Sequence, residues 1–222
     1  MRKVFWENPY QHTLVTKVSS VDGNEIGFDD TIAYSFAGGQ ESDTAFVNGL
    51  QIQNSRRIDN LIYYTLPDNH EFKIGDIVTM EIDWPRRSRL MRLHFAAELI
   101  LEIVTQRYGF EKIGAHISEK KSRIDFITDV NVSTLFNEIL AEYNNIIEMN
   151  LIIEKGYLDI ATQRRYWKID GFAQVPCGGT HVNTTGEVGF VNLKRERLGK
   201  SKERIEITLQ DDSPEYVFQQ QQ

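Results

Sequence analysis

Residues 84–109, WPRRSRLMRLHFAAELILEIVTQRYG, have the clearest structural pattern in the chain. Proline is tolerated in the first turn of a helix, and the glycine at the end is a common helix stop. Between them, apolar residues recur at helical spacing on one stripe. The pattern predicts a long helix from about Pro85 to Gly109. The stripe consists of Leu90, Ala97, Leu101, Val104 and Tyr108.

Upstream of this helix, the chain has the pattern of short strands. Alternation of polar and apolar residues, or enrichment in β-forming residues, predicts four of them. Turns rich in Gly, Pro, Asn and Asp separate them. Such spacing indicates a small closed β-barrel domain over residues 1–85. The predicted strands lie near residues 13–18, 45–52, 61–66 and 77–82.

Downstream of the helix, strand patterns and one more helical pattern are mixed. This mixture predicts the α+β fold class, with a second domain over residues 86–210. The last twelve residues, DDSPEYVFQQQQ at 211–222, are polar and low in complexity, so we expect a disordered tail. The second helix is predicted near residues 134–149, and strands near 113–118, 123–127, 166–169 and 205–209.

Composition excludes several classes of protein. Hydrophobic residues make up 41% of the 222 residues, which is typical of globular proteins. No stretch approaches the roughly 20 apolar residues that span a bilayer, and the N-terminus lacks the apolar core of a signal peptide. We therefore expect a cytoplasmic protein with no membrane partner. The single cysteine, Cys177, excludes an intramolecular disulfide framework.

The formal charge of −7 argues at first against a nucleic-acid partner. However, residues 1–85 hold 6 Lys and Arg against 13 Asp and Glu, so the whole excess of acid lies there. The remaining residues are neutral and contain two basic clusters. The first is Arg86, Arg87, Arg89 and Arg92, and the second lies within 194–204. On charge alone, such runs most often form a solvated surface, and phosphate contacts are the alternative.

His94 and Glu98 stand four residues apart on the predicted helix, so their side chains share one face. Their neighbours on that face are Leu90 and Leu101. A carboxylate beside an apolar stripe is rare unless it is paired or ligates a metal, because burying a charge is costly. A lone histidine there is more often a satisfied core residue, so Glu98 is the more informative of the two.

A second pair with the same spacing is Cys177 and His181, within CGGTH. The two glycines favour a tight loop over a helix. Thiolate, imidazole and carboxylate are all zinc ligands, and one pair from a helix with one pair from a loop can complete a tetrahedron. The alternative is a buried free cysteine and a surface histidine. Together, the two pairs favour a zinc site.

Three segments around these pairs carry a family resemblance. HFAAE at 94–98, CGGTHV at 177–182 and TGEVG at 185–189 resemble the editing domain that alanyl-tRNA synthetases share with free-standing alanyl-tRNA editing proteins, the AlaX group. In that family, a His-x-x-x-His helix and a Cys-x-x-x-His loop hold zinc. Further similarity at residues 30–40, 122–126 and 199–205 extends the resemblance over about residues 5–209.

The resemblance implies a fold and an activity. The fold would be a translation-protein-like barrel followed by an α+β editing domain of the threonyl/alanyl-tRNA synthetase additional-domain type, in the medium-length form. The activity would be hydrolysis, in trans, of the ester of mischarged alanine tRNA, with serine as the main target and glycine secondary. The implied partner is the acceptor end of tRNA and not DNA, and the implied cofactor is one Zn²⁺ per chain.

The resemblance also implies roles for particular residues. Thr31 would recognise the hydroxyl of serine, and Gln40 would lie in the same pocket. The zinc ligands and catalytic residues would be His94, Glu98, Cys177 and His181. The candidate phosphate contacts are Arg86, Arg87, Arg89, Arg92, Lys194, Arg195, Lys200 and Lys202.

Two positions depart from the family pattern. Ala37 stands where the family has a glycine, and Glu98 stands where it has the second helix histidine. Three interpretations of Glu98 follow. It ligates zinc in place of the histidine, it stands off the metal as a general base beside three ligands and an open position, or it marks a degenerate site.

Two other functions remain compatible with the sequence. One is a non-catalytic tRNA-binding module that keeps the fold after losing a ligand. The other is a zinc hydrolase of a different small acyl ester or amide. Zinc content measured together with turnover of seryl-tRNA separates these possibilities from the editing function.

Overall fold

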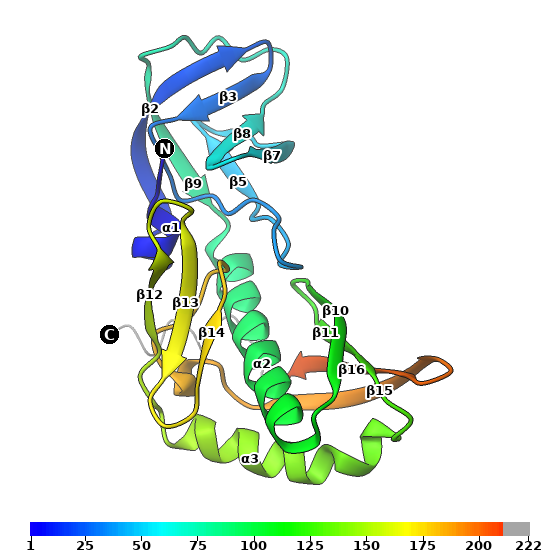
Figure 1. The fold of residues 1–222 in the computed structure, drawn as a ribbon. Coiled ribbons are helices and arrows are strands. Elements are labelled where there is room, and N and C mark those ends of the chain that lie inside the picture. Colours follow the sequence, from blue (N-terminus) through cyan, green and yellow to red (C-terminus); the bar gives the residue numbers. More distant parts are fainter. Residues whose placement is uncertain (211–222) are drawn as a thin grey trace. The chain divides into compact units, whose positions relative to one another are not determined.

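The structure, a computed structural model, describes residues 1–210, so the predicted disordered tail at 211–222 lies outside the described residues. The chain separates into two compact units, and each is described by itself (Figure 1). The first unit comprises residues 1–37 and 41–88. The second comprises residues 38–40 and the chain from Arg89 onward. The predicted boundary at residue 85 therefore falls inside a helix, whose first turn belongs to the first unit.

The first unit is built mainly from antiparallel strands. Seven of them form one sheet in the order β6-β5-β9-β2-β3-β8-β7, and β1 and β4 form a separate parallel pair. A short helix, α1 (Val4–Glu7), follows β1. The strands are β1 (Arg2–Lys3), β2 (Thr13–Asp22), β3 (Glu25–Phe28), β4 (Asp30–Thr31), β5 (Ala45–Val47), β6 (Leu50–Gln51), β7 (Asn54–Ile58), β8 (Leu61–Thr65) and β9 (Ile77–Ile82).

The closed barrel expected from the sequence is not confirmed. Strands β6 and β7 form the two edges of the seven-stranded sheet, and within residues 1–210 no strand pairing joins them. The strand expected over 45–52 is also interrupted. Asn48 and Gly49 have φ angles of 47° and 81°, and they form the turn of the hairpin between β5 and β6. An Asn-Gly pair at this place is the typical two-residue hairpin connection.

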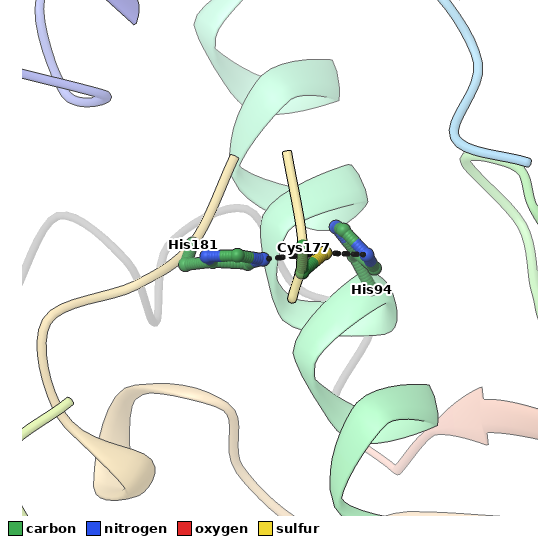
Figure 2. Close-up of side chains that lie close together, drawn as sticks. All are labelled: His94, Cys177 and His181. Atoms are coloured by element: carbon green, nitrogen blue, oxygen red, sulfur yellow. Dashed lines mark hydrogen bonds between the residues drawn. The ribbon is translucent and has the colours of Figure 1, made fainter. Parts of the chain in front are cut away.

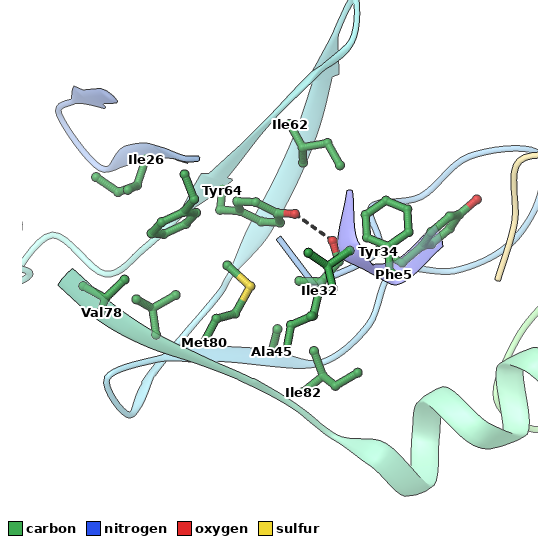
Figure 3. Close-up of a cluster of buried hydrophobic side chains, with 14 of the residues drawn as sticks. Phe5, Ile26, Ile32, Tyr34, Ala45, Ile62, Tyr64, Val78, Met80 and Ile82 are labelled. Atoms are coloured by element: carbon green, nitrogen blue, oxygen red, sulfur yellow. Dashed lines mark hydrogen bonds between the residues drawn. The ribbon is translucent and has the colours of Figure 1, made fainter. Parts of the chain in front are cut away.

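The core of the first unit lies against one face of this sheet. Figure 3 shows side chains from β3, β8 and β9 converging there, with Tyr64 near the centre. Phe5 from α1 packs edge-on against Tyr34, with ring centroids 5.4 Å apart. Alternate residues of β9, Val78, Met80 and Ile82, are buried, as the predicted alternation requires.

The decisive helix, α2, spans Trp84–Tyr108. The Asp83 carboxylate accepts a hydrogen bond from the Arg86 amide at 3.0 Å and so caps its start, and Gly109, with φ of +68°, ends it. Every residue of 90–100 is buried except Glu98. A single apolar stripe was expected, but Figure 1 shows the two sheets of the second unit on either side of α2. Burial therefore extends around the helix.

The second unit combines α2 with a four-stranded sheet, a three-stranded sheet and helix α3 (Phe136–Glu148), which confirms a mixed α+β fold. The sheet orders are β10-β11-β16-β15 and β12-β13-β14. The strands are β10 (Glu111–Ile117), β11 (Ser122–Ile127), β12 (Glu154–Asp159), β13 (Arg164–Ile169), β14 (Ala173–Pro176), β15 (Val191–Gly199) and β16 (Lys202–Leu209). Two 3₁₀ turns, η1 (Val132–Leu135) and η2 (Thr185–Glu187), complete the unit.

Both predicted helices and the strands predicted downstream are present, whereas β12, β14 and β15 were not expected. Among residues 1–210, no helix has the length and apolar character needed to cross a membrane.

Candidate metal centre

Three side chains of the second unit converge on one point. His94 comes from α2, and Cys177 and His181 come from the loop that follows β14. The Cys177 sulfur lies 3.5 Å from His94 Nε2 and 3.3 Å from His181 Nε2. Figure 2 shows the sulfur between the two imidazole rings. Both histidines are buried, so one thiol and two imidazoles form a group that can bind a metal ion.

Gly179 explains why this loop can approach the helix so closely. A Cβ atom at Gly179 would lie 1.9 Å from His94 Cε1 and 2.4 Å from His94 Nδ1. Any other residue would therefore displace either the loop or the imidazole ring. Gly179 of the CGGTH segment is therefore required for close packing between the loop and His94.

Gln40 fixes the same loop from the other side. Its amide nitrogen donates to Thr180 Oγ1 at 2.8 Å, and its amide oxygen accepts from the Thr180 backbone N–H at 3.1 Å. Gln40 is fully buried and forms an isolated β-bridge with Ile117. The preceding Gly39 has φ of +90°, and a Cβ there would lie 2.6 Å from the Ala115 carbonyl oxygen. The Gly-Gly-Gln segment thus supports the ligand loop.

Further support comes from Lys155 and from the TGEVG segment. The Lys155 ammonium donates to the Val182 carbonyl at 3.2 Å and to Asn183 Oδ1 at 2.5 Å. The Thr185 hydroxyl donates to the Ile146 carbonyl of α3 at 2.7 Å, and the Glu187 carboxylate accepts from the backbone N–H of Asn183. These bonds hold the chain immediately after His181.

The two histidines have opposite pKa shifts. Burial lowers the pKa of His94, but the charge of Cys177 and hydrogen bonds to Cys177 and Glu98 outweigh it and raise the pKa to about 10. Burial, together with the nearby charge of His94, lowers the pKa of His181 well below its usual range. Without a metal, these shifts favour a proton on His94 and a neutral His181. Metal binding at His94 would release that proton.

The structure brings together three of the four predicted ligands. Among the described residues, the donor atoms that all lie within 4.8 Å of one another belong to His94, Cys177 and His181, and Glu98 is not included. The Glu98 carboxylate accepts a hydrogen bond from Trp167 Nε1 at 2.8 Å through one oxygen, and its other oxygen lies 3.5 Å from His94 Nε2. The Trp167 indole thus anchors the carboxylate outside the three-donor group.

Trp167 was missed by the reasoning from sequence. It lies on β13, is fully buried, and packs edge-on against Phe95 with ring centroids 5.1 Å apart. Burial raises the pKa of the Glu98 carboxyl, but hydrogen bonds from His94 and Trp167 outweigh it and hold the pKa below its usual range. Glu98 is therefore ionised at neutral pH. No sequence signal links a strand tryptophan to a helix carboxylate 69 residues away.

Thr31 lies in the first unit, whereas the three donor residues lie in the second. The residue is fully buried, its hydroxyl lies 2.6 Å from the Tyr64 hydroxyl, and it accepts from the Ala33 amide at 3.1 Å. These contacts give Thr31 a structural role in the core of the first unit.

Two arginines of the first basic cluster, which were predicted as phosphate contacts, are buried. Arg87 is fully buried and ion-paired with Asp43, which is also fully buried. Arg92 is 3% exposed, and its Nε donates to the Val188 carbonyl at 3.0 Å. Their charges are directed to internal acceptors. Of the other two, Arg86 pairs with Glu41 at 2.8 Å, and Arg89 donates to the Glu119 carbonyl at 3.3 Å.

The second basic cluster lies along the hairpin of β15 and β16, where it presents Lys194, Lys200 and Lys202 at exposed positions. Arg195 differs, because it donates through two nitrogens to the carboxylate of Glu203, which is 4% exposed. Three of the four predicted contacts in this cluster are therefore accessible.

The chain is similar to known proteins over different parts of its length. Residues 168–206, which include the Cys177–His181 loop, match the model of the threonyl and alanyl tRNA synthetase second additional domain. The chain is 27% identical to an alanine–tRNA ligase of Methanococcus maripaludis over 92% of this chain, but it spans only 25% of that ligase.

Two of the relatives match over nearly the whole length of both proteins. One is the alanyl-tRNA editing protein AlaX-M of Saccharolobus solfataricus, which is 27% identical over 93% of this chain and 98% of the relative. The other is the alanyl-tRNA editing protein AlaX-M of Pyrococcus horikoshii, which is 30% identical over 94% of this chain and 98% of the relative. Because the similarity covers nearly the whole of both proteins, the chain belongs to the family of alanyl-tRNA editing proteins.

Proposed function

We propose that the protein is a zinc-dependent aminoacyl-tRNA deacylase. It hydrolyses, in trans, the ester that joins serine, and secondarily glycine, to the terminal adenosine of alanine tRNA. The observation that carries this proposal is the group formed by His94, Cys177 and His181, in a chain that belongs to an editing family. An editing reaction is needed because a pocket that accepts alanine cannot strongly reject an amino acid with one extra hydroxyl.

The spacing of the three donors supports zinc. Zinc binds imidazole nitrogen at about 2.0–2.1 Å and thiolate sulfur at about 2.3 Å, so a tetrahedral angle places two such donors about 3.5 Å apart. The N···S distances of 3.5 Å and 3.3 Å are close to this value. One thiolate and two imidazoles are also a donor set that zinc prefers. When bound, zinc would polarise the ester carbonyl or lower the pKa of a water molecule.

The residues of this chain supply the positioning. His94, Cys177 and His181 would hold the metal, and Gln40 would keep the ligand loop in place through its two hydrogen bonds with Thr180. Recognition of the serine hydroxyl by Thr31 is implied by the family resemblance and remains a proposal. The exposed lysines Lys194, Lys200 and Lys202 are proposed to contact the phosphates of the tRNA.

Deacylation assays with zinc quantified in the same sample test the proposal. Purified full-length protein is incubated with seryl-, glycyl- and alanyl-tRNA specific for alanine, before and after removal of zinc with a chelator. We expect one zinc per chain, hydrolysis of seryl-tRNA faster than of alanyl-tRNA, and loss of turnover without zinc. A zinc-loaded protein that hydrolyses none of the three would contradict the proposal and favour a non-catalytic tRNA-binding module.

A further inference from the structure

Glu98 carries a largely buried carboxylate whose two oxygens have different surroundings. One oxygen is fixed by the indole N–H of Trp167 at 2.8 Å. The other faces His94 Nε2 at 3.5 Å. The side chain is 14% exposed, whereas the other residues of 90–100 are buried. The carboxylate is therefore not completely enclosed by the protein.

Metal binding would remove the second partner of this carboxylate. A histidine nitrogen that ligates a metal gives up its lone pair and carries no proton, so it cannot donate a hydrogen bond. His94 Nε2 is the atom that faces both Cys177 and Glu98. Once His94 binds the metal, the second Glu98 oxygen has no donor from this ring. A buried carboxylate oxygen without a partner is costly, and a cationic donor would satisfy it.

The proposed substrate carries such a donor. An aminoacyl ester has an α-ammonium group, and a single carbon separates it from the ester carbonyl. A carboxylate next to the metal ligands could therefore hold the ammonium while the ester carbonyl lies at the metal. An N-acylated aminoacyl ester lacks the charge and would leave the carboxylate unpaired.

We propose that the Glu98 oxygen that faces His94 binds the α-ammonium group of the aminoacyl ester once the metal is bound, and that Trp167 is the positioning residue that keeps this carboxylate out of the metal shell. This inference rests on the proposed deacylase function. It predicts that the site distinguishes aminoacyl esters with a free amino group from N-acylated ones. The specificity would protect tRNAs that carry a blocked amino acid or a peptide.

The test uses full-length, zinc-loaded protein and two stable probes. They are 3′-seryl-amido-3′-deoxyadenosine, in which an amide replaces the ester, and its N-acetyl form. Binding of each is measured by calorimetry for the parent, Glu98→Gln, Trp167→Phe and Glu102→Gln. Glu102 lies one turn further along α2, is partly buried, and provides a matched control for the loss of one carboxylate. Zinc stoichiometry is measured for each variant.

We expect the parent to prefer the free-amine probe by about tenfold or more, which is the effect of one hydrogen bond to a charged group. Glu98→Gln should retain one zinc per chain and lose most of this preference. Trp167→Phe, which keeps an aromatic ring but removes the N–H donor, should lose part of it, and Glu102→Gln should behave like the parent.

Two results would overturn the inference while leaving the deacylase function intact. If Glu98→Gln loses zinc, the carboxylate is a metal ligand. If Glu98→Gln keeps zinc and keeps the preference, the ammonium is bound elsewhere. If the zinc-loaded parent binds neither probe, the proposed function fails as well, and the inference fails with it.

Discussion

Helix α2 carries two buried polar groups that differ in how completely their atoms are satisfied. At Arg87, each nitrogen of the guanidinium donates a hydrogen bond, to Asp43 or to the carbonyls of Pro9 and Ile32. At His94, Nδ1 is buried without a hydrogen-bond partner among residues 1–210, and Nε2 is shared between Cys177 and Glu98. Arg87 belongs to the first unit and His94 to the second.

This difference separates structural polar groups from functional ones. A buried group whose partners are all supplied by the chain stabilises the fold and offers nothing to a ligand. A buried group with incomplete partners costs stability, and it persists where an outside atom completes it. Changes at Arg87 should therefore lower the stability of the fold and leave metal binding intact. Changes around His94 should weaken metal binding and leave the stability of the fold largely unchanged.

The largest effect is expected for Arg87→Met. Removing the arginine leaves the fully buried Asp43 carboxylate without its counter-charge, which should lower the free energy of unfolding by about 3–5 kcal/mol. Denaturant titration measures this loss. Arg56→Met is the control, because Arg56 pairs with Glu25 at an exposed position and its loss should change the free energy of unfolding far less. Equal losses in the two variants would contradict the structural role of Arg87.

Gln40→Leu tests the support of the metal-ligand loop in the second unit. The variant removes both hydrogen bonds to Thr180 and so loosens the loop that carries Cys177 and His181. Zinc affinity should fall about 10- to 100-fold, which is the usual effect of losing support for metal ligands. Competition with a chromophoric chelator measures the affinity. An unchanged zinc affinity would show that the loop holds its ligands without Gln40.

Thr31→Val tests whether the hydrogen bonds of the buried Thr31 hydroxyl stabilise the core of the first unit. The change removes the hydrogen bond to Tyr64 and leaves the Ala33 amide without its acceptor, so the variant should lose about 1–2 kcal/mol of unfolding free energy. Zinc content should not change. The proposed recognition of serine requires, in addition, a smaller preference for seryl- over alanyl-tRNA. If selectivity stays the same, Thr31 is structural only.

The smallest effect is expected at the exposed lysines of the β15–β16 hairpin. Replacing Lys194, Lys200 and Lys202 with glutamine should weaken tRNA binding and make it less sensitive to salt. The slope of the logarithm of the binding constant against the logarithm of the salt concentration should become shallower by about 0.7–0.9 for each phosphate that a lysine no longer neutralises. Binding measured at several salt concentrations gives the slope. The same replacement at the buried Arg92 should act through folding instead, because its guanidinium donates to a backbone carbonyl.

Local patterns predicted much of this molecule. The long helix from Pro85 to Gly109 followed from its proline, its glycine and its apolar spacing. Donor chemistry identified two candidate ligand pairs, His94 with Glu98 and Cys177 with His181, and the structure brings together all of these residues except Glu98. Strand β15 was not predicted, because its run of charged residues hides the alternation that marks a strand.

Contacts between distant residues were not predictable in the same way. Arg87 and Arg92 look like surface charges in the sequence, and only the fold shows the buried acceptors that they contact. The anchoring of Glu98 by Trp167 likewise depends on strand β13 packing against α2. The tertiary structure determines whether a buried polar residue has all its hydrogen-bond partners. This property distinguishes Arg87 from His94 on α2.

Zinc binding to the parent and to Cys177→Ala is the most direct test of the proposed metal centre. Each protein is stripped of metal, and its zinc affinity and stoichiometry are measured by competition with a chelator, with unfolding followed in parallel. We predict one tightly bound zinc in the parent and none in Cys177→Ala, with similar unfolding free energies for the two metal-free proteins. A parent that binds no zinc, or a Cys177→Ala variant that binds it equally well, would contradict the assignment of this group as a metal centre.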